Sequence, residues 1–514
     1  MSALQQVRRS PLEGLYRLFK SAFGEVWTQN MGKAGIILLV ILIIVSVYTV
    51  MVMPANFDSV WNNRKEWDTN PFVAPPEWVR FFGFPVARHA VIELNKPVES
   101  RVYLEPLIID DIQLFGFIQR FSAEYVLDSD AYPQSVLVRF VETRFDNISI
   151  RGRFIEPQVV IYIFIERPDG SVILMNNPET FTLRNLAGKD IRLDQDVAAS
   201  WIEKKLGVPQ DIAKQVINFY LFGSVIGENY YTEPLQGVYR IDIIASYLAP
   251  GVDPRDLRVV MESKGLGIRE ITVIVKGSAY GLAGTDDAGR DLFLGLLYGF
   301  PVALLIGIFA AVSAVLIGMI AGVISGYYGG LVDDAIQRTV DIIGNIPLLP
   351  ILILIGVIVQ EWDISAWERL FIIIAFLVVF SWGGLAIIIR SMTLSIKAEP
   401  YIEAAKALGA SNIRIIFKHV IPQLIPYMMA SLVFSVPGAI LAEAGLSVIG
   451  VRHGLPTWGS ILAEARAYIG AGGSYGVWWW IFPPGILIGI TALTFVLLGL
   501  AAETIVEPRL RRRV

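Results

Sequence analysis

Six long apolar runs with few charges divide the chain, and each is long enough to cross a lipid bilayer. A helix needs about 20 apolar residues to span the hydrocarbon core. The fifth run is interrupted by Pro437 and Glu443, and a proline within a span is tolerated where neighbouring helices satisfy the freed carbonyl groups. The pattern predicts a bundle of six transmembrane helices near residues 34–53, 301–324, 336–359, 370–392, 422–446 and 478–500.

Lys and Arg gather in three regions that six spans place on the same side of the membrane. These regions are the N-terminal flank, the segment between the fourth and fifth spans, and the basic tail at 509–514. Positively charged flanks favour the cytoplasmic side, so both termini are predicted to be cytoplasmic. Residues 1–33 show apolar positions at helical spacing, typical of an amphipathic helix in the membrane interface or of an ordinary helix packed on the bundle.

The stretch between the first two spans, residues 54–283, has fewer apolar residues and charges of both signs. Segments such as 135–143 and 158–166 are rich in β-branched and aromatic residues and lie near turn signals, whereas 196–221 favours helix. We therefore predict a mainly β (α+β) domain, placed outside the cell or in the periplasm by the topology. It carries no recognisable catalytic motif. Asn147 begins an N-glycosylation triplet, which is common by chance.

Composition excludes several classes of protein. Of 514 residues 54% are hydrophobic and only 18% are charged, against about 25% in soluble proteins. A net charge of −4 gives no sign of a nucleic-acid partner. The absence of cysteine removes disulfides and thiolate metal sites, and three scattered histidines do not predict a metal centre. No phosphate-binding loop of the Gly-x4-Gly-Lys-Ser/Thr type is present, so the chain is not predicted to be an enzyme that hydrolyses ATP.

The predicted cytoplasmic loop at 395–421 has the most specific pattern. Pro400 suits the first turn of a helix, and Gly409 can end that helix in the left-handed conformation. Ser411 can begin a second helix, and Pro422 opens the fifth span. The loop therefore reads as a compact pair of helices joined by a turn and facing the cytoplasm.

Within this loop Glu-Ala-Ala is followed after three residues by glycine, and after nine more by His419-Val-Ile421-Pro. The pattern resembles the EAA loop of ABC importer permeases, although that family usually has Ile at the position of His419 and Leu at that of Ile421. In the family this loop docks in a groove of the ATPase subunit and transmits nucleotide-driven motion. The resemblance places the ATPase-coupling contact at Glu403, Ala404, Ala405, Gly409 and Pro422.

Further motifs indicate which branch of the ABC importer permeases the chain resembles. Residues 73–76 (Val-Ala-Pro-Pro) and 284–291 (Gly-Thr-Asp-Asp-Ala-Gly-Arg-Asp) look like two halves of one motif, separated here by about 200 residues of insert. With 456–459 (Pro-Thr-Trp-Gly) and 507–510 (Glu-Pro-Arg-Leu), they are similar to the C-type subunit of the dipeptide/oligopeptide (nickel) permease family. The resemblance implies a type I ABC importer permease fold, with a core at 284–508 that holds five spans.

Two features within the predicted spans suggest functional roles, one in helix packing and one in the translocation pathway. Small residues at four-residue intervals give the second span a smooth face for helix packing, within this subunit or against a second permease; they are Gly318, Gly322 and Gly326. An acidic residue in a span is costly unless it faces a cavity or a partner. Glu443 could therefore line the translocation pathway, or it could simply be solvated near the outer end of its span.

The resemblance implies an importer of di- or oligopeptides in the plasma membrane. Its partners would be a second permease, two ATPase subunits that bind ATP and Mg²⁺, an extracellular substrate-binding protein and the bilayer; the chain itself would bind no cofactor. The same machinery could import oligosaccharides. A membrane-anchored receptor or assembly protein would need only one or two spans and would not explain the loop. A secondary transporter would show inverted repeats and ion-coupling charges, which the sequence lacks.

Overall fold

The computed structural model describes residues 26–109, 112–146, 148–150, 153–227, 229–470 and 476–506. Asn147, the basic tail at 509–514 and most of the segment at 1–33 lie outside these residues. Contacts divide the chain into two compact units, one ending at Asn63 and resuming at Leu292, the other spanning Arg64–Asp291. Both borders fall later than the predicted 54 and 283. The short helix α3 (Phe57–Asn62) belongs to the first unit because Trp61 packs against Gly295.

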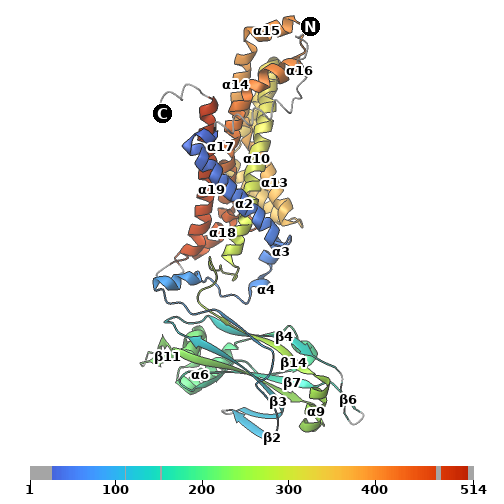
Figure 1. Ribbon diagram of the computed structural model, residues 1–514, viewed down its shortest axis with the longest axis vertical. Coiled ribbons are helices and arrows are strands. Elements are labelled where there is room, and N and C mark those ends of the chain that lie inside the picture. Colours follow the sequence, from blue (N-terminus) through green and yellow to red (C-terminus); the bar gives the residue numbers. More distant parts are fainter. Residues whose placement is uncertain are drawn as a thin grey trace, which may run out of the picture. The chain divides into compact units, whose positions relative to one another are not determined.

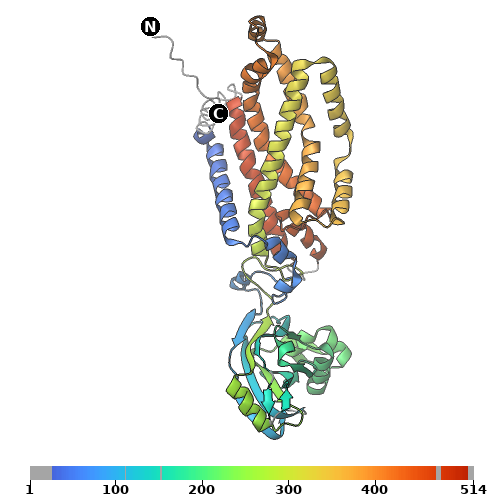
Figure 2. The ribbon, with the colours of Figure 1, turned by 90° about the vertical axis from the view of Figure 1, so that its right-hand side faces the viewer.

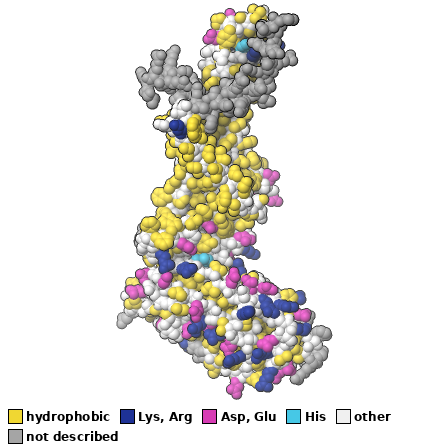
Figure 3. Space-filling view, viewed as in Figure 1, with side chains coloured by type: hydrophobic (Ala, Val, Ile, Leu, Met, Phe, Trp, Pro, Cys, Tyr) yellow, Lys and Arg dark blue, Asp and Glu magenta, His cyan; other side chains and the backbone are white. Residues whose placement is uncertain are grey.

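The first unit is helical, and its long helices run alongside one another (Figures 1 and 2). A broad hydrophobic belt covers the visible face of these helices in Figure 3. Five of the described helices or helix pairs are long and apolar enough to cross a membrane, and a sixth span exists if one bent pair is counted as one. The helices are α2 (Asn30–Val52), α10 (Leu292–Tyr328), α11 (Gly330–Asn345), α12 (Leu348–Gln360), α13 (Ala366–Ser381), α14 (Gly383–Lys397), α15 (Pro400–Ala407), α16 (Asn412–Ile415), α17 (Ile421–Val448), α18 (Trp458–Ala465) and α19 (Trp478–Val506).

The bent pair falls where one continuous third span, 336–359, was expected. The two helices of this region meet at a break with a bend of 78°. Ile346 and Pro347 occupy the break, both with extended backbone. Proline lacks an amide N–H and disfavours helical conformation in the residue before it, which explains the break.

The glycine face of α10 packs on α14. A Cβ atom built on Gly318 would lie 2.9 Å from the carbonyl oxygen of Trp382, and one on Gly322 would lie 2.6 Å from that of Ala386. The corresponding distance for Gly326, to the carbonyl oxygen of Arg390, is 2.7 Å. No side chain fits at such distances, so these glycines permit a close helix contact within this chain.

The second unit is rich in β structure. Two antiparallel sheets share one core, to which Phe140 and Val273 contribute from the first sheet and Phe121 and Ile243 from the second. In the first sheet the order is β1 (Ala90–Leu94), β14 (Gly267–Lys276), β4 (Ser135–Arg144), β10 (Asp190–Arg192). In the second it is β2 (Glu99–Ile109), β3 (Ile112–Leu127), β13 (Gly237–Leu248), β7 (Gln158–Glu166), β8 (Val172–Leu174), with β9 (Glu179–Thr182) also on β7.

Smaller elements complete this unit. Tight pairs of strands are formed by β5 (Ile148–Ile150) with β6 (Arg153–Ile155) and by β11 (Gly223–Ile226) with β12 (Tyr231–Pro234).

Alternation along β13 places Ile241, Ile243 and Ala245 in the core, as a strand with one face on the core requires. The helices are α4 (Arg64–Trp67), η1 (Glu77–Phe82), α5 (Leu183–Leu186), α6 (Gln195–Leu206), α7 (Gln210–Gln215), α8 (Ile217–Phe222) and α9 (Pro254–Lys264).

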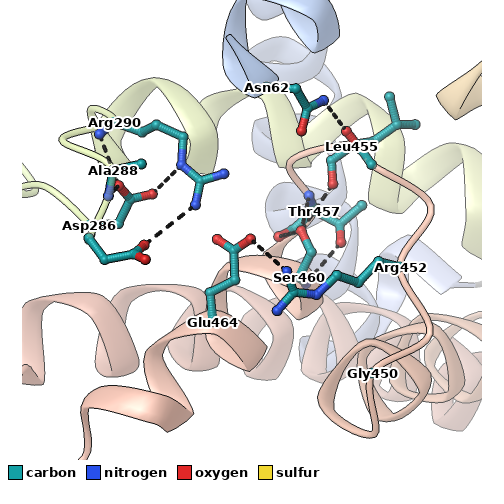
Figure 4. Close-up of polar contacts among 12 residues, drawn as sticks. Asn62, Asp286, Ala288, Arg290, Gly450, Arg452, Leu455, Thr457, Ser460 and Glu464 are labelled. Carbon is teal, nitrogen blue, oxygen red and sulfur yellow. Dashed lines mark hydrogen bonds and ion pairs between the residues drawn. The ribbon is translucent and has the colours of Figure 1, made fainter. Parts of the chain in front are cut away.

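The two motif segments that the insert separates in sequence lie side by side in the second unit. Val73 N–H donates to the carbonyl of Asp286 at 2.8 Å, and Thr285 N–H donates to that of Ala74 at 2.8 Å. The second segment is closed by Arg290, whose guanidinium lies on Asp286 at 2.5 Å (Figure 4). The insert thus leaves and returns at one place, so the paired segments stay together despite some 200 intervening residues.

His89, just before β1, is held in its neutral form. Its ring lies edge-on to Tyr280, with centroids 5.3 Å apart, and its Nδ1 is buried without a hydrogen-bond partner among the described residues. Burial, with a smaller contribution from the nearby Lys276 charge, lowers the pKa of His89 from 6.5 to about 4. The folded unit therefore resists a protonation that the unfolded chain accepts.

Acid should consequently destabilise the β-rich unit through His89. The unfolded chain binds this proton near pH 6.5 and the folded chain only near pH 4. The free energy of unfolding is therefore unaffected by His89 above about pH 6.5, and it decreases as the pH falls from 6.5 to about 4. Urea unfolding at several pH values should show a weaker pH dependence for His89→Gln than for the wild type. Equal slopes for the two proteins within the window would contradict this assignment.

Candidate functional site

Helix α15 carries the predicted coupling residues and is anchored by one side chain. Ile402 is fully buried and joins a cluster that also contains Ile415 and Val420 from the returning chain and Val323 from α10. Pro400 stands in the first turn of this helix, as expected from its fixed backbone angle. In Figure 1, α15 and α16 lie together at one end of the helical unit. Through this cluster α15 is packed against the spanning helix α10. A movement of α15 would therefore be passed to α10.

The remaining surface of α15 is presented to solvent. Glu403 and Ala404 are exposed, and Ala405 is half-buried. Leu408, directly after the helix, is 88% exposed. Gly409 has φ of +81°, the left-handed conformation that glycine adopts at the lowest cost at a helix end, and an added Cβ would meet no atom of the described residues within 4 Å. The helix end thus offers an acidic group, small residues and one apolar side chain.

The return from α15 to α17 is ordered by polar contacts. Ser411 caps α16, and Tyr327 at the end of α10 donates its hydroxyl to Asn412 at 3.1 Å. A π-helical turn at Ile416–Val420 contains His419 and leads into α17, where Pro422 lies in the first turn. Such π turns are rare and frequent at functional sites. The segment from 400 to 420 is therefore a defined hairpin, which we call the coupling hairpin.

Glu443 lies in a different place, toward the C-terminal end of α17. It is 4% exposed, so the alternative of a solvated carboxylate is wrong. Its Oε1 accepts from the hydroxyl of Thr457 at 2.8 Å and from that of Ser447 at 3.0 Å, and lies 3.0 Å from Nε2 of His453. Leu455 N–H donates to Nδ1 of His453 at 3.1 Å, so Nε2 carries the proton and donates to the carboxylate.

These contacts hold the loop at 449–457 against α17. Thr457 begins α18 with a reciprocal capping box to Ser460, and Arg452 lies 3.9 Å from Glu464 of the same helix (Figure 4). Asn62 of α3 donates to the carbonyl of Gly454 at 2.8 Å. The carboxylate of Glu443 is thus engaged by groups of its own chain, which favours a structural role over substrate contact.

Replacing Glu443 separates these two roles. Glu443→Gln keeps an acceptor oxygen for the same three donors, so we expect transport and stability close to the wild type. Glu443→Ala leaves buried donors unpaired and should cost about 1–3 kcal/mol of stability. The measurements are substrate uptake and thermal unfolding of both variants. Loss of uptake in a stable Glu443→Gln protein would instead indicate that the charge acts in the translocation pathway.

The structure places the predicted residues in three separate regions. Glu403, Ala404, Ala405 and Gly409 lie in the coupling hairpin, and Pro422 lies just after it in the first turn of α17. The α10 glycines face α14, and Glu443 lies apart from both. Leu408 was missed because a leucine among helix formers normally reads as a core residue. Among the described residues no group of three or more His, Asp or Glu side chains is arranged to hold a metal ion.

Comparison with known proteins defines the class. Long apolar helices identify a multi-pass membrane protein, and residues 314–512 match the binding-protein-dependent transport system inner membrane component. The dipeptide transport system permease protein of Bacillus subtilis (strain 168) is 34% identical over 231 residues, which are 45% of this chain and 69% of that protein. The oligopeptide transport system permease protein of the same organism is also 34% identical, over 45% of this chain and 72% of its own.

The chain therefore belongs to the family of binding-protein-dependent transport system inner membrane components, within its dipeptide/oligopeptide permease branch. It is a multi-pass inner-membrane protein. Its relatives are permease subunits, as their names state. A solved methionine ABC transporter in an inward-facing conformation matches 42% of this chain and 97% of its own, with 19% identity and a TM-score of 0.33, a likeness too low to carry an argument.

Proposed function

We propose that this chain is the permease subunit of an ATP-driven importer of di- or oligopeptides, and that the coupling hairpin receives the motion of separate ATPase subunits. The observation that carries the proposal is the exposed end of α15, where Glu403, Ala404 and Leu408 face solvent while Ile402 is fully buried. An exposed apolar side chain beside small residues suits a docking surface, because a partner can approach the backbone closely.

The anchoring of the hairpin supports a lever mechanism. Ile402 packs with residues of α10 and α17, two of the longest helices of the first unit. A displacement of α15 would change the packing of both, and packed helices favour discrete arrangements over continuous deformation. ATP binding by a partner would then shift the balance between inward-open and outward-open arrangements of the bundle.

The topology that this function requires follows from charge. A six-span topology would put both termini and the coupling hairpin in the cytoplasm, and the β-rich unit outside the cell or in the periplasm. We expect ATP and Mg²⁺ to bind only to partner ATPases. The further partners are a second permease subunit and an external substrate-binding protein.

Peptides are the favoured cargo because the relatives named for a substrate are named for dipeptide and oligopeptide transport. Oligosaccharide import by the same machinery is the alternative, and uptake of labelled peptides measured against labelled oligosaccharides distinguishes them.

Purification of the intact complex from its native membrane tests the machinery itself. The expected result is co-purification of two ATPase subunits and a second permease, with ATPase activity stimulated by a substrate-loaded binding protein. A chain that purifies stably with no ATPase subunit, or a coupling hairpin that is labelled from the same side as the β-rich unit, would refute the proposal.

A further inference from the structure

The β-rich unit exposes a cluster of large apolar side chains on and beside η1, which we call the aromatic patch. It consists of Trp78, Phe81, Phe82 and Leu282. Phe81 is 88% exposed, Phe82 72% and Leu282 63%. Val79 is the one residue of this short helix that is buried, so the helix turns its aromatic side chains outward.

The side chains of the aromatic patch are held in place by contacts with one another and with the neighbouring backbone. The indole N–H of Trp78 donates to the carbonyl of Leu282 at 2.9 Å, and the Trp78 and Phe82 rings meet edge-on with centroids 6.0 Å apart. Glu77 N–H donates to the carbonyl of Gly281 at 3.0 Å, which fixes η1 to the segment that carries Leu282. Scattered single apolar residues on a surface need no explanation, but a contiguous group does.

Charged side chains surround the aromatic patch. An open hollow of about 640 Å³ is lined by Trp78, Phe81 and Leu282 together with Glu77, Arg80 and Arg88. Arg80 pairs with Asp128 at 2.7 Å and is half-exposed. Aromatic rings with adjacent arginines are the combination that occurs at membrane–water interfaces, where rings sit among the headgroups and long basic side chains extend toward phosphates.

Chain connectivity limits how far the aromatic patch can lie from α10. Thr285 and Asp291 form an antiparallel bridge, so the intervening residues add almost no length between Leu282 and Leu292, where α10 begins. With three extended residues before the bridge, Leu282 stays within roughly 20 Å of Leu292. The bridge is reinforced by Arg290, which is paired with Asp286.

We propose that the aromatic patch inserts into the headgroup layer of the bilayer that α10 crosses, and so anchors the β-rich unit on the membrane surface. A lipid surface is favoured over a protein partner because a short tether limits the distance of these side chains from α10 and from the bilayer that it crosses, whereas a partner would have to reach them there. The proposal is independent of the coupling role and of the cargo.

The absence of cysteine from the chain makes a direct test possible. Phe81→Cys and Leu282→Cys are labelled separately with an environment-sensitive fluorophore, in the full-length protein reconstituted in lipid nanodiscs. Quenching is measured with spin-labelled lipids and with aqueous iodide. Phe115→Cys is the matched control, because Phe115 is 54% exposed and lies near the opposite end of β3 from Asp128, the partner of Arg80. Thermal unfolding of each labelled protein verifies the fold.

The expected result is several-fold stronger lipid quenching, and several-fold weaker iodide quenching, at positions 81 and 282 than at 115. Iodide quenching at all three positions without lipid quenching would overturn the proposal. Protection from both quenchers at 81 and 282, with cross-linking to another subunit, would also overturn it and identify a protein interface instead. Since both substituted residues are largely exposed, neither change should disturb folding.

Discussion

Leu408→Asp should abolish ATPase association and substrate uptake without changing the stability of the chain. Leu408 is 88% exposed and follows directly on α15, so its side chain contributes little to folding and is available to a partner. A charge placed in an apolar docking groove loses the burial energy and adds a desolvation cost. We expect at least about a tenfold loss of affinity for the ATPase subunits, equivalent to about 1.4 kcal/mol. Co-purification and substrate-stimulated ATPase activity measure the effect.

The matched control is Leu331→Asp. Leu331 is 87% exposed and lies at the start of α11, outside the coupling hairpin. It should leave association and uptake unchanged. Equal losses in both variants would mean that any new charge on this part of the protein disturbs the complex, and the specific role of α15 would be refuted.

Gly409 provides a second control that separates backbone shape from surface chemistry. Asparagine tolerates its left-handed conformation better than other residues, so Gly409→Asn should retain coupling, whereas Gly409→Val should strain the turn. An added Cβ meets no atom of the described residues within 4 Å, so the expected loss in the valine variant comes from backbone strain at positive φ.

Hydrophobic patterning located five of the described helices or helix pairs that are long and apolar enough to cross a membrane, because the bilayer imposes both the length and the composition of such a helix. The same pattern predicted one continuous third span, and the structure instead breaks at Ile346 and Pro347. A proline within an apolar run can kink, break or merely bend a helix, depending on neighbours that the local sequence does not specify. Apolar density alone therefore located this region without determining its shape.

Some features of the candidate site could likewise be predicted from local sequence, and others could not. The turn at Gly409 and the helix start at Pro400 follow from local backbone chemistry, and the structure has both. The burial of Glu443 depends on His453 and Thr457, which lie beyond its own helix and are brought back by the loop, so no local pattern indicated it. The exposure of Leu408 likewise depends on which face Ile402 anchors. The functional roles of these residues stay predictions.

Gly322→Leu should have the largest effect on the fold of the helical unit. A Cβ at this position would lie 2.6 Å from the carbonyl oxygen of Ala386 and 2.7 Å from Cβ of Ile389, so α10 and α14 would have to separate. Overpacking a close contact costs typically about 1–3 kcal/mol, and a leucine against a backbone carbonyl belongs at or above the upper end. The thermal unfolding midpoint in detergent and the yield of folded protein measure this loss.

Gly438→Leu, in α17, distinguishes this contact from a general effect of removing glycine. An added Cβ at Gly438 meets no atom within 4 Å in the part of the chain that the structure describes, so the substitution should be tolerated, and improved helix propensity can offset part of any cost. If Gly322→Leu proved as stable as Gly438→Leu in the isolated chain but failed to assemble with a second permease, the glycine face would have to act between subunits. Loss of stability in the isolated chain is the expected outcome, because the nearest atoms to the missing Cβ belong to this chain itself.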